Sequence, residues 1–245
     1  MNSLHGKTAL VTGANGHLGG AIALRLAKEG ANVAVACHHN KAAAEELAAK
    51  LKRGGVKALA VQADASNEKE VARMVRTIEQ RLGGGDVLVN CVGGLTRKPL
   101  AKMVRHEFQA VLDSNLFSAM ICSKACLPGM RRRKFGRIVN FGHRRVEALA
   151  ASRTAAAYHV AKTGLLLVTR AMAVEEAPHG ITVNMVSPGG LFDSSPRADK
   201  KEIPRKRFGK AEDVANAIAF LAHPDSDFVT GENVFVTGGY KLHGG

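Results

Sequence analysis

Tyr158 and Lys162 stand four positions apart in the segment Tyr158-His159-Val160-Ala161-Lys162. On a helix this spacing places both side chains on one face, one turn apart. A phenol has an ordinary pKa of about 10 and is a poor acid or base near neutral pH. We expect the Lys162 ammonium to stabilise the phenolate and to lower the pKa of Tyr158 towards the working range. The same spacing is common on helix surfaces, but it predicts proton transfer at a carbonyl or an alcohol.

A glycine-rich loop near the start of the chain predicts a cofactor-binding site for the reaction of these two residues. Val11-Thr12-Gly13-Ala14-Asn15-Gly16-His17-Leu18-Gly19 follows a short apolar strand and opens a helix, which is the context that a dinucleotide-binding fingerprint requires. Gly13 suits the tight turn, Gly16 a close approach of the pyrophosphate, and Gly19 the packing of helix on strand. The free N–H groups at the start of the helix favour phosphates. A nicotinamide dinucleotide is therefore the expected cofactor.

The end of the second expected strand indicates which form of the cofactor binds. Folds that bind NAD usually carry Asp or Glu there, but this segment reads Val35-Ala36-Cys37-His38-His39-Asn40-Lys41. No carboxylate would repel a 2′-phosphate, and His38, His39 and Lys41 could reach it. We expect NADP(H) rather than NAD(H), although these residues could equally be exposed at a helix start.

Alternating strands and helices are expected from one end of the chain to the other. Helical spacing or composition predicts helices over 18–29, 41–53, 67–82, 104–133, 154–177 and 211–222, with Pro128-Gly129 breaking the last turns of the fourth. Apolar runs predict strands over 7–12, 32–36, 56–62, 86–90, 137–141, 181–186 and 233–237. Repeated units of this kind indicate an α/β fold, a Rossmann-type doubly wound parallel sheet with helices on both faces. We expect one domain over residues 1–245, with a mobile loop at 190–209.

Composition excludes several classes of protein. The four cysteines are too few and too scattered for a disulfide framework or a zinc site, so no metal is expected. No run of eighteen apolar residues and no signal peptide is present, so we expect a cytoplasmic protein that starts where its gene does and has no membrane partner. The net charge of +14 would attract anions. Aromatic residues are only 4%, and without a stacking platform no nucleic-acid partner is expected.

Taken together, the motifs make the sequence similar to the short-chain dehydrogenase/reductase family, in its short single-domain branch. The resemblance covers nearly the whole chain, and several motifs in the right order are more specific than any one. It rests on the loop Gly13–Gly19, Asp64, Asn90-Cys91-Val92-Gly93, Asn115, Tyr158 with Lys162, Asn184 through Pro188-Gly189, Thr230-Gly231 and Gly238-Gly239.

The resemblance implies a role for each matching residue. Tyr158 would give or take the substrate proton, Lys162 would bond the nicotinamide ribose, and Asn115 would hold a water in a proton relay with Lys162. Asp64 would contact the adenine amino group, and Asn90 would support the strand beside the cofactor. The expected cofactor-binding residues are Gly13, Asn15, Gly16, His17, Leu18, Gly19, His38, His39, Asp64, Ala65, Asn90, Gly93, Tyr158, Lys162, Pro188, Gly189 and Leu191. The family also implies a homodimer or homotetramer, formed through the helices expected at 104–130 and 154–177.

Three positions depart from the family pattern; one is the threonine that the family often places after the Pro-Gly segment, which is replaced near Asp193, with Ser194 beside it. His17 stands where the short branch has its middle glycine, while Gly16 gives the spacing of longer members that still bind the cofactor. The catalytic serine after the fifth strand is replaced: alignment on that strand places His143 there, and counting back from Tyr158 reaches Arg145. A neutral imidazole could donate an equivalent hydrogen bond, whereas Arg145 would suit an anionic substrate. We favour His143 as the fourth catalytic residue; Ser152 more plausibly lines the pocket.

These features lead to two hypotheses. The first is an NADP-dependent carbonyl reductase or alcohol dehydrogenase acting on a small molecule, anionic or carrier-linked, with 3-oxoacyl-acyl-carrier-protein reductases as the nearest general resemblance. The run Arg131-Arg132-Arg133-Lys134 could then dock an acidic carrier, although we favour a solvated helix end for it. The second, motivated by the missing serine, is a non-catalytic nucleotide-binding regulator or partner subunit of the same fold.

Overall fold

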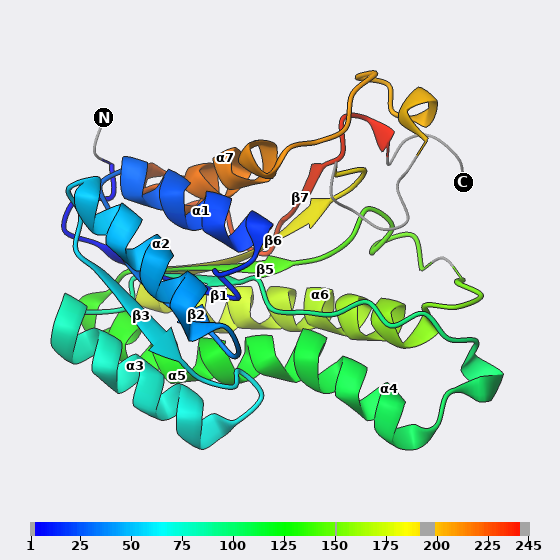
Figure 1. The fold of residues 1–245 in the computed structure, drawn as a ribbon, viewed down its shortest axis with the longest axis horizontal. Coiled ribbons are helices and arrows are strands. Elements are labelled where there is room, and N and C mark those ends of the chain that lie inside the picture. Colours follow the sequence, from blue (N-terminus) through cyan, green and yellow to red (C-terminus); the bar gives the residue numbers. More distant parts are fainter. Residues whose placement is uncertain (1–2, 150, 192–198, 241–245) are drawn as a thin grey trace.

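One parallel sheet runs through the chain in the computed structural model, which describes residues 3–149, 151–191 and 199–240 (Figure 1). Its seven strands follow the order β3-β2-β1-β4-β5-β6-β7, and every pair is parallel. The order reverses between β1 and β4, which is where open sheets of this type bind ligands, at the carboxyl ends of the strands. The Rossmann-type fold predicted from the sequence is confirmed.

The strands form where apolar residues follow one another without interruption. Every residue of β1, β4 and β5 is buried, as expected for strands covered on both faces. The bounds are β1 Thr8–Thr12, β2 Asn32–Cys37, β3 Ala58–Gln62, β4 Val87–Asn90, β5 Gly136–Phe141, β6 Ile181–Pro188 and β7 Asn233–Val236.

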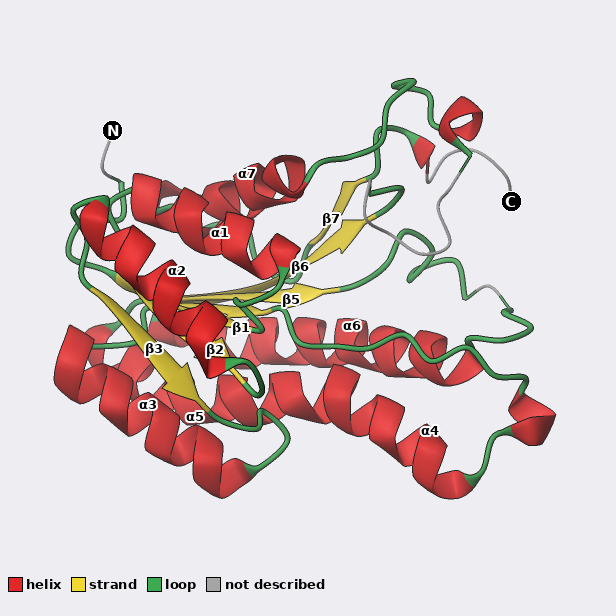
Figure 2. Ribbon diagram, viewed as in Figure 1, coloured by secondary structure: helices red, strands yellow, loops and turns green. Residues whose placement is uncertain are grey.

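Helices cover both faces of the sheet (Figure 2). One apolar core joins α1, α2 and α7 to the upper face, and a second joins α3, α5 and α6 to the lower face. The bounds are α1 His17–Lys28, α2 Lys41–Arg53, α3 Glu68–Leu82, α4 Arg105–Leu112, α5 Ser118–Arg133, α6 Ala156–Glu176 and α7 Ala211–Ala222. Asn67, predicted as the first helical residue, is instead the cap of α3, and its Oδ1 accepts from the N–H of Lys69 at 3.1 Å.

The long helix predicted over 104–133 differs from the prediction in two ways. A π-helical turn, Asp113–Phe117, separates α4 from α5. The predicted break at Pro128 is wrong, because α5 continues to Arg133 with Pro128 inside it. Proline removes one helical hydrogen bond, but the turn that follows is held by burial of Met130 and by ion pairs from Arg131 to Glu176 and from Arg133 to Asp86.

The same stretch, Arg105–Arg133, is long and apolar enough by length and composition to cross a membrane, although no run of eighteen apolar residues was found. In the structure it lies against α3, α6 and strands β4 and β5, so it forms part of the helical layer below the sheet.

The segment predicted as a mobile loop, residues 190–209, includes residues 192–198, which lie outside the described part of the chain. Its described part contains a short 3₁₀-helix, Lys200–Glu202, and is tied back where Gly209 N–H donates to the carbonyl of Gly190 at 2.9 Å.

Candidate active site

The glycine loop forms the tight turn that was predicted between β1 and α1. Gly13 has a positive φ of 63°, and a Cβ atom on Gly19 would lie 2.5 Å from the carbonyl oxygen of Gly13. Both positions therefore require glycine. No side chain caps α1 at Gly16, so the first N–H groups of the helix remain available for an anion. The loop fits the pyrophosphate of a dinucleotide.

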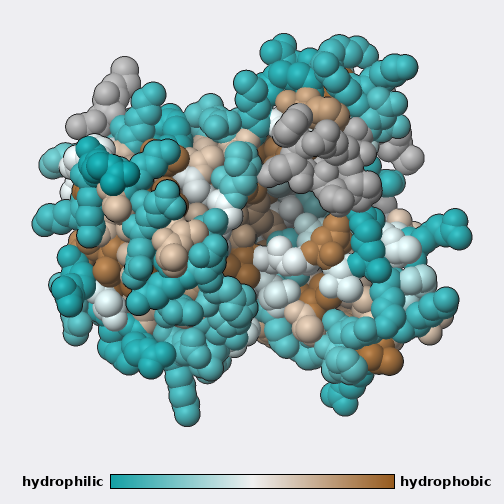
Figure 3. Space-filling view, in the orientation of Figure 1, coloured by the Kyte–Doolittle hydropathy of each residue, from teal (hydrophilic) through white to brown (hydrophobic). Residues whose placement is uncertain are grey.

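A cavity of about 340 Å³ opens beside this loop, at the carboxyl ends of β1, β2 and β3. The face drawn in Figure 3 is hollowed between the part that carries α1 to α3 and the part that carries α4. Asp64 lines the cavity and accepts hydrogen bonds from Ser66 Oγ and Ser66 N–H, which lower the pKa of its carboxyl group. An ionised Asp64 is suited to accept from an adenine amino group. The remaining walls include Thr12, Gly13, Ala36, Cys37, His38, Ala63, Ala65, Ser66 and Val92.

Two histidines lie at the end of β2, near the rim of this cavity. Their rings, on His38 and His39, have centroids 3.8 Å apart, and His38 Nε2 lies 3.9 Å from Asp64 Oδ2. Lys41, the third residue predicted to reach a 2′-phosphate, starts α2 and lies 3.5 Å from Glu45. No acidic side chain stands at the end of β2 itself, and the carboxylates of Asp64 and Glu45 lie beside His38 and Lys41.

Tyr158 and Lys162 lie one turn apart on α6, and Lys162 Nζ is 5.7 Å from the Tyr158 ring centroid. Tyr158 packs against a small buried apolar cluster of Val111, Ala157 and Ala161. Burial raises the pKa of Tyr158 to about 12 and lowers that of Lys162 to about 8. The predicted lowering of the Tyr158 pKa is therefore wrong for the chain by itself, because loss of hydration outweighs attraction to an ammonium at this distance. The phenol is neutral at pH 7 and can donate a proton.

Asn115 is fully buried in the π-helical turn, and its side chain meets that of Lys162 next to Gly93. Its Nδ2 donates to the carbonyl of Gly94 at 2.9 Å, whereas Oδ1 has no hydrogen-bond partner among the described residues. A Cβ atom on Gly93 would contact Asn115 Oδ1 and lie 3.3 Å from Lys162 Nζ. Irregular turns of this kind often mark functional sites. An acceptor and an ammonium around one small space fit the water that the family resemblance implies.

His143 lies at the end of β5, with its ring centroid 5.7 Å from that of Tyr158. Burial, His159 and Lys162 lower the pKa of His143 to about 3, so the imidazole is neutral at pH 7. Its Nδ1 accepts from the N–H of Arg145 at 3.3 Å, which places the ring proton on Nε2. Nε2 is buried without a partner in the described part of the chain. The Nε2–H group of His143 is therefore a free donor near the phenol of Tyr158, and it could make the hydrogen bond that the family's serine hydroxyl would make.

The other predicted candidates for this role lie elsewhere. Arg145 and Ser152 line a separate cavity of about 370 Å³ together with Val160 and Thr163. Val160 is two positions from Tyr158 and therefore lies on the opposite side of α6. Arg145 and Ser152 thus line a cavity other than the one beside the glycine loop.

Three predicted cofactor residues lie at the carboxyl end of β6. Pro188 ends the strand, the N–H of Gly189 donates to the carbonyl of Val236 at 3.2 Å, and Leu191 pairs with Gly209. Asn90, at the end of β4, donates to Asn140 Oδ1 at 2.8 Å and to Ser123 Oγ at 3.1 Å. These bonds hold β4 to β5 and α5, as the resemblance implies.

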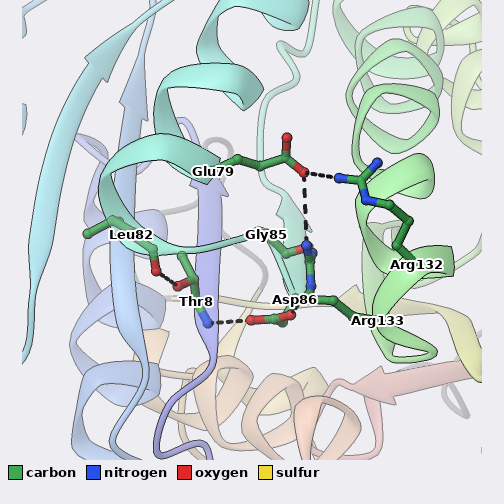
Figure 4. A network of polar contacts seen from close by, with 7 residues as sticks. All are labelled: Thr8, Glu79, Leu82, Gly85, Asp86, Arg132 and Arg133. Atoms are coloured by element: carbon green, nitrogen blue, oxygen red, sulfur yellow. Dashed lines mark hydrogen bonds and ion pairs between the residues drawn. The ribbon is translucent and has the colours of Figure 1, made fainter.

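The basic run Arg131–Lys134 is not part of the site. It lies at the end of α5, beside Thr8 and Asp86 at the amino ends of β1 and β4 (Figure 4). His143 instead follows the carboxyl end of β5, and Tyr158 lies in the first turn of α6. Arg133 Nε donates to Asp86 Oδ1 at 2.7 Å, and the other oxygen of Asp86 accepts from the N–H of Thr8. Arg131 pairs with Glu176 and Arg132 with Glu79. The three arginines hold α5 to its neighbours.

Two residues near the site were not singled out from the sequence. Cys91 lies close enough to Lys162 for the two groups to influence each other's pKa, and burial raises the pKa of its thiol to about 12, so the thiol is neutral at pH 7. Tyr240 contacts Arg144, the residue after His143. The only available signal for Tyr240 was its rarity, since the chain has two tyrosines.

Comparison with known proteins agrees with this geometry. Residues 13–241 match the family model described as Enoyl-(Acyl carrier protein) reductase. A 3-oxoacyl-[acyl-carrier-protein] reductase FabG of Staphylococcus epidermidis is 37% identical over 244 residues, covering 96% of this chain and 99% of the relative. An acetoacetyl-CoA reductase of Allochromatium vinosum is 37% identical over 246 residues, covering 97% and 99%. The crystal structure of a short-chain type dehydrogenase/reductase from Mycobacterium marinum superposes with a TM-score of 0.90 at 32% identity, covering 98% of this chain and 97% of that one.

Proposed function

The chain belongs to the short-chain dehydrogenase/reductase family, which makes it a nicotinamide-dependent oxidoreductase of carbonyl or alcohol groups, and we propose that it reduces the 3-oxo group of an acyl thioester with NADPH. One observation carries the proposal: the neutral phenol of Tyr158, the ammonium of Lys162 and the free Nε2 of His143 lie together, and Lys162 lies beside Gly93, whose neighbour Val92 lines the cavity next to the glycine loop. The relatives named above reduce 3-oxoacyl-carrier protein and acetoacetyl-CoA, both 3-oxoacyl thioesters.

When bound, the nicotinamide supplies the hydride. Tyr158 gives its proton to the carbonyl oxygen, because its raised pKa keeps the phenol neutral at pH 7. Lys162, with a pKa of about 8, is mostly protonated at pH 7 and stabilises the phenolate that remains. The free Oδ1 of Asn115 holds the water through which that phenolate regains a proton.

His143 replaces the family's serine as the hydrogen-bond donor to the carbonyl oxygen. A neutral imidazole with its proton on Nε2 offers one directed N–H, the same single donor that a hydroxyl offers. An N–H aimed at an oxygen that gains negative charge stabilises the transition state. Its low pKa keeps the ring from competing with Tyr158 for the proton.

NADPH is proposed over NADH because of the residues at the rim of the cavity. The paired rings of His38 and His39 offer donors where NAD-specific relatives carry a carboxylate. Gly13, Asn15, Gly16, His17, Leu18, Gly19, Asp64, Ala65, Asn90, Gly93, Pro188, Gly189 and Leu191 complete the proposed cofactor site.

We further propose a single-domain, cytoplasmic enzyme that assembles as a homodimer or homotetramer through α5 and α6. Val160, Leu167 and Val174 recur every seven residues on α6 and are 53%, 62% and 79% exposed. An apolar row of this kind suits the corresponding helix of a second copy. The net charge of +14 favours an anionic substrate such as a coenzyme A thioester.

The test is consumption of NADPH, followed by its absorbance, with acetoacetyl-CoA, longer 3-oxoacyl thioesters and uncharged ketones. We expect turnover with the thioesters and a much higher KM with NADH in place of NADPH. If NADPH binds but no member of the panel oxidises it, the proposal fails and the non-catalytic alternative, a nucleotide-binding regulator or partner subunit, takes its place.

A further inference from the structure

Tyr240 lies where three distant segments of the chain meet. Its hydroxyl donates to Glu202 Oε2 at 3.0 Å, in the segment that follows β6. The guanidinium carbon of Arg144 lies 4.1 Å from the centroid of its ring. A Cβ atom on Gly190 would lie 3.6 Å from the ring edge, so the ring also packs on the backbone beside the proposed nicotinamide cradle.

Arg144 connects Tyr240 to His143. Two bonds close the turn around it: Arg145 N–H donates to His143 Nδ1 at 3.3 Å, and Val146 N–H donates to the His143 carbonyl at 3.0 Å. The side chain of Arg144 also packs on Gly189, where an added Cβ atom would lie only 2.9 Å from its own Cβ. The backbone of Arg144 thus belongs to the turn that orients the imidazole, while Tyr240 and Gly189 hold its side chain.

The turn that carries Tyr240 is itself anchored. Tyr240 N–H donates to the carbonyl of Thr237 at 3.1 Å, and Arg205 N–H donates to the carbonyl of Gly238 at 3.2 Å. Pro204 packs against Gly239, where an added Cβ atom would lie 2.9 Å from the proline ring. Tyr240 is therefore a fixed support for Arg144.

We propose that Tyr240 is a positioning residue for carbonyl reduction: its ring holds the Arg144 guanidinium, and this contact keeps the turn of His143 in the orientation that presents Nε2 to the substrate oxygen. This inference rests on the proposed role of His143. The positive charge of Arg144 also contributes to the low pKa of His143, after burial, His159 and Lys162. A guanidinium over an aromatic ring stabilises by roughly 0.5–2 kcal/mol, equivalent to a change of about 2- to 30-fold in the populated orientation.

The first measurement compares Tyr240→Leu, which removes the ring, with Tyr240→Phe, which keeps it. We expect Tyr240→Leu to lower kcat by about 3- to 10-fold while the Kd for NADPH stays unchanged, and we expect Tyr240→Phe to retain most of the activity. Phe228→Leu is the matched control, because Phe228 is 99% exposed. Equal kcat values for Tyr240→Leu and Tyr240→Phe would overturn the inference.

A double-mutant cycle separates positioning from general destabilisation. If Tyr240 acts through His143, Tyr240→Leu lowers kcat in the native background but not in a His143→Ala background; an equal loss in both backgrounds contradicts the inference. If Tyr240→Leu does not fold, Arg144→Gln replaces it, since it removes the guanidinium and leaves the ring. Failure of the proposed function looks different, because the native protein itself would then leave NADPH unoxidised.

Discussion

Replacing Lys162 by methionine should make the protein more stable and inactive. Lys162 is 3% exposed, and burial lowers its pKa from the ordinary 10.5 to about 8. Each pKa unit corresponds to about 1.4 kcal/mol, so holding this ammonium in the folded protein costs about 3 kcal/mol at pH 7. Methionine has a similar length and carries no charge. Lys162→Met should therefore raise the free energy of unfolding by about 3 kcal/mol at pH 7, or the Tm by roughly 6–12 °C.

The dependence of this difference on pH follows from the direction of the shift. Between about pH 8 and 10.5 the unfolded chain binds more protons at Lys162 than the folded chain does, so native stability rises with pH across this window. The methionine variant lacks this gain. The gap in stability between the two proteins should therefore close as the pH rises from 8 to 10.5. Groups such as Tyr158 titrate in both proteins and largely cancel in the difference.

Urea unfolding followed by circular dichroism, at one fixed chain concentration, measures the gap at pH 7, 8.5 and 10. Lys50→Met is the matched control: Lys50 is exposed on α2, and its replacement should change stability by less than about 0.5 kcal/mol at every pH. If Lys162→Met is no more stable than the native protein at pH 7, or if its advantage does not vary with pH, the reasoning about a buried ammonium is wrong.

Two further predictions concern the cofactor site. His38→Ala should weaken NADPH binding by about 10- to 100-fold, as for one lost hydrogen bond to a charged group, and leave NADH binding unchanged; titration of coenzyme fluorescence checks this, and an equal loss for both coenzymes would remove His38 from 2′-phosphate recognition. Gly19→Ala should distort the turn, since its Cβ atom would meet the Gly13 carbonyl at 2.5 Å, and weaken binding of both coenzymes at least about 10-fold; native affinity in that variant would show that the loop can adjust.

Much of the fold follows from local patterns in the sequence. The glycine loop was expected between a strand and a helix, because a strand-like apolar run precedes its glycines and helical spacing of apolar residues follows them. The structure places the loop there. The helices over 41–53 and 211–222 have the predicted bounds: both are Ala-rich, Asn40 caps the first, and Asp213 accepts from the N–H of Lys210 at the start of the second. The spacing of four residues on α6 was enough to predict that the side chains of Tyr158 and Lys162 lie close together.

The parts that were not predicted depend on tertiary contacts. Pro128 does not end α5, because residues far along the chain, Asp86 and Glu176, hold the turn beyond it. The same pairs give Arg131 and Arg133 a structural role that their charge alone did not reveal. The π-helical turn that buries Asn115 has no local signature.

The shift in the pKa of Tyr158 was predicted in the wrong direction, because this shift also depends on tertiary packing. Spacing on a helix shows that an ammonium is near, but only the tertiary packing that buries Tyr158 shows how far the phenol is removed from water. The available Nε2 of His143 likewise depends on a backbone N–H that occupies Nδ1.

The central claim is that Tyr158 donates the proton in a reaction with NADPH, and the Tyr158→Phe variant tests it most directly. Kd for NADPH and kcat with acetoacetyl-CoA would be measured for both proteins under the same conditions. We predict the same Kd within about twofold and a kcat at least about 100-fold lower, the usual contribution of a positioned acid. A variant that binds NADPH and turns over at the native rate would contradict the proposed mechanism.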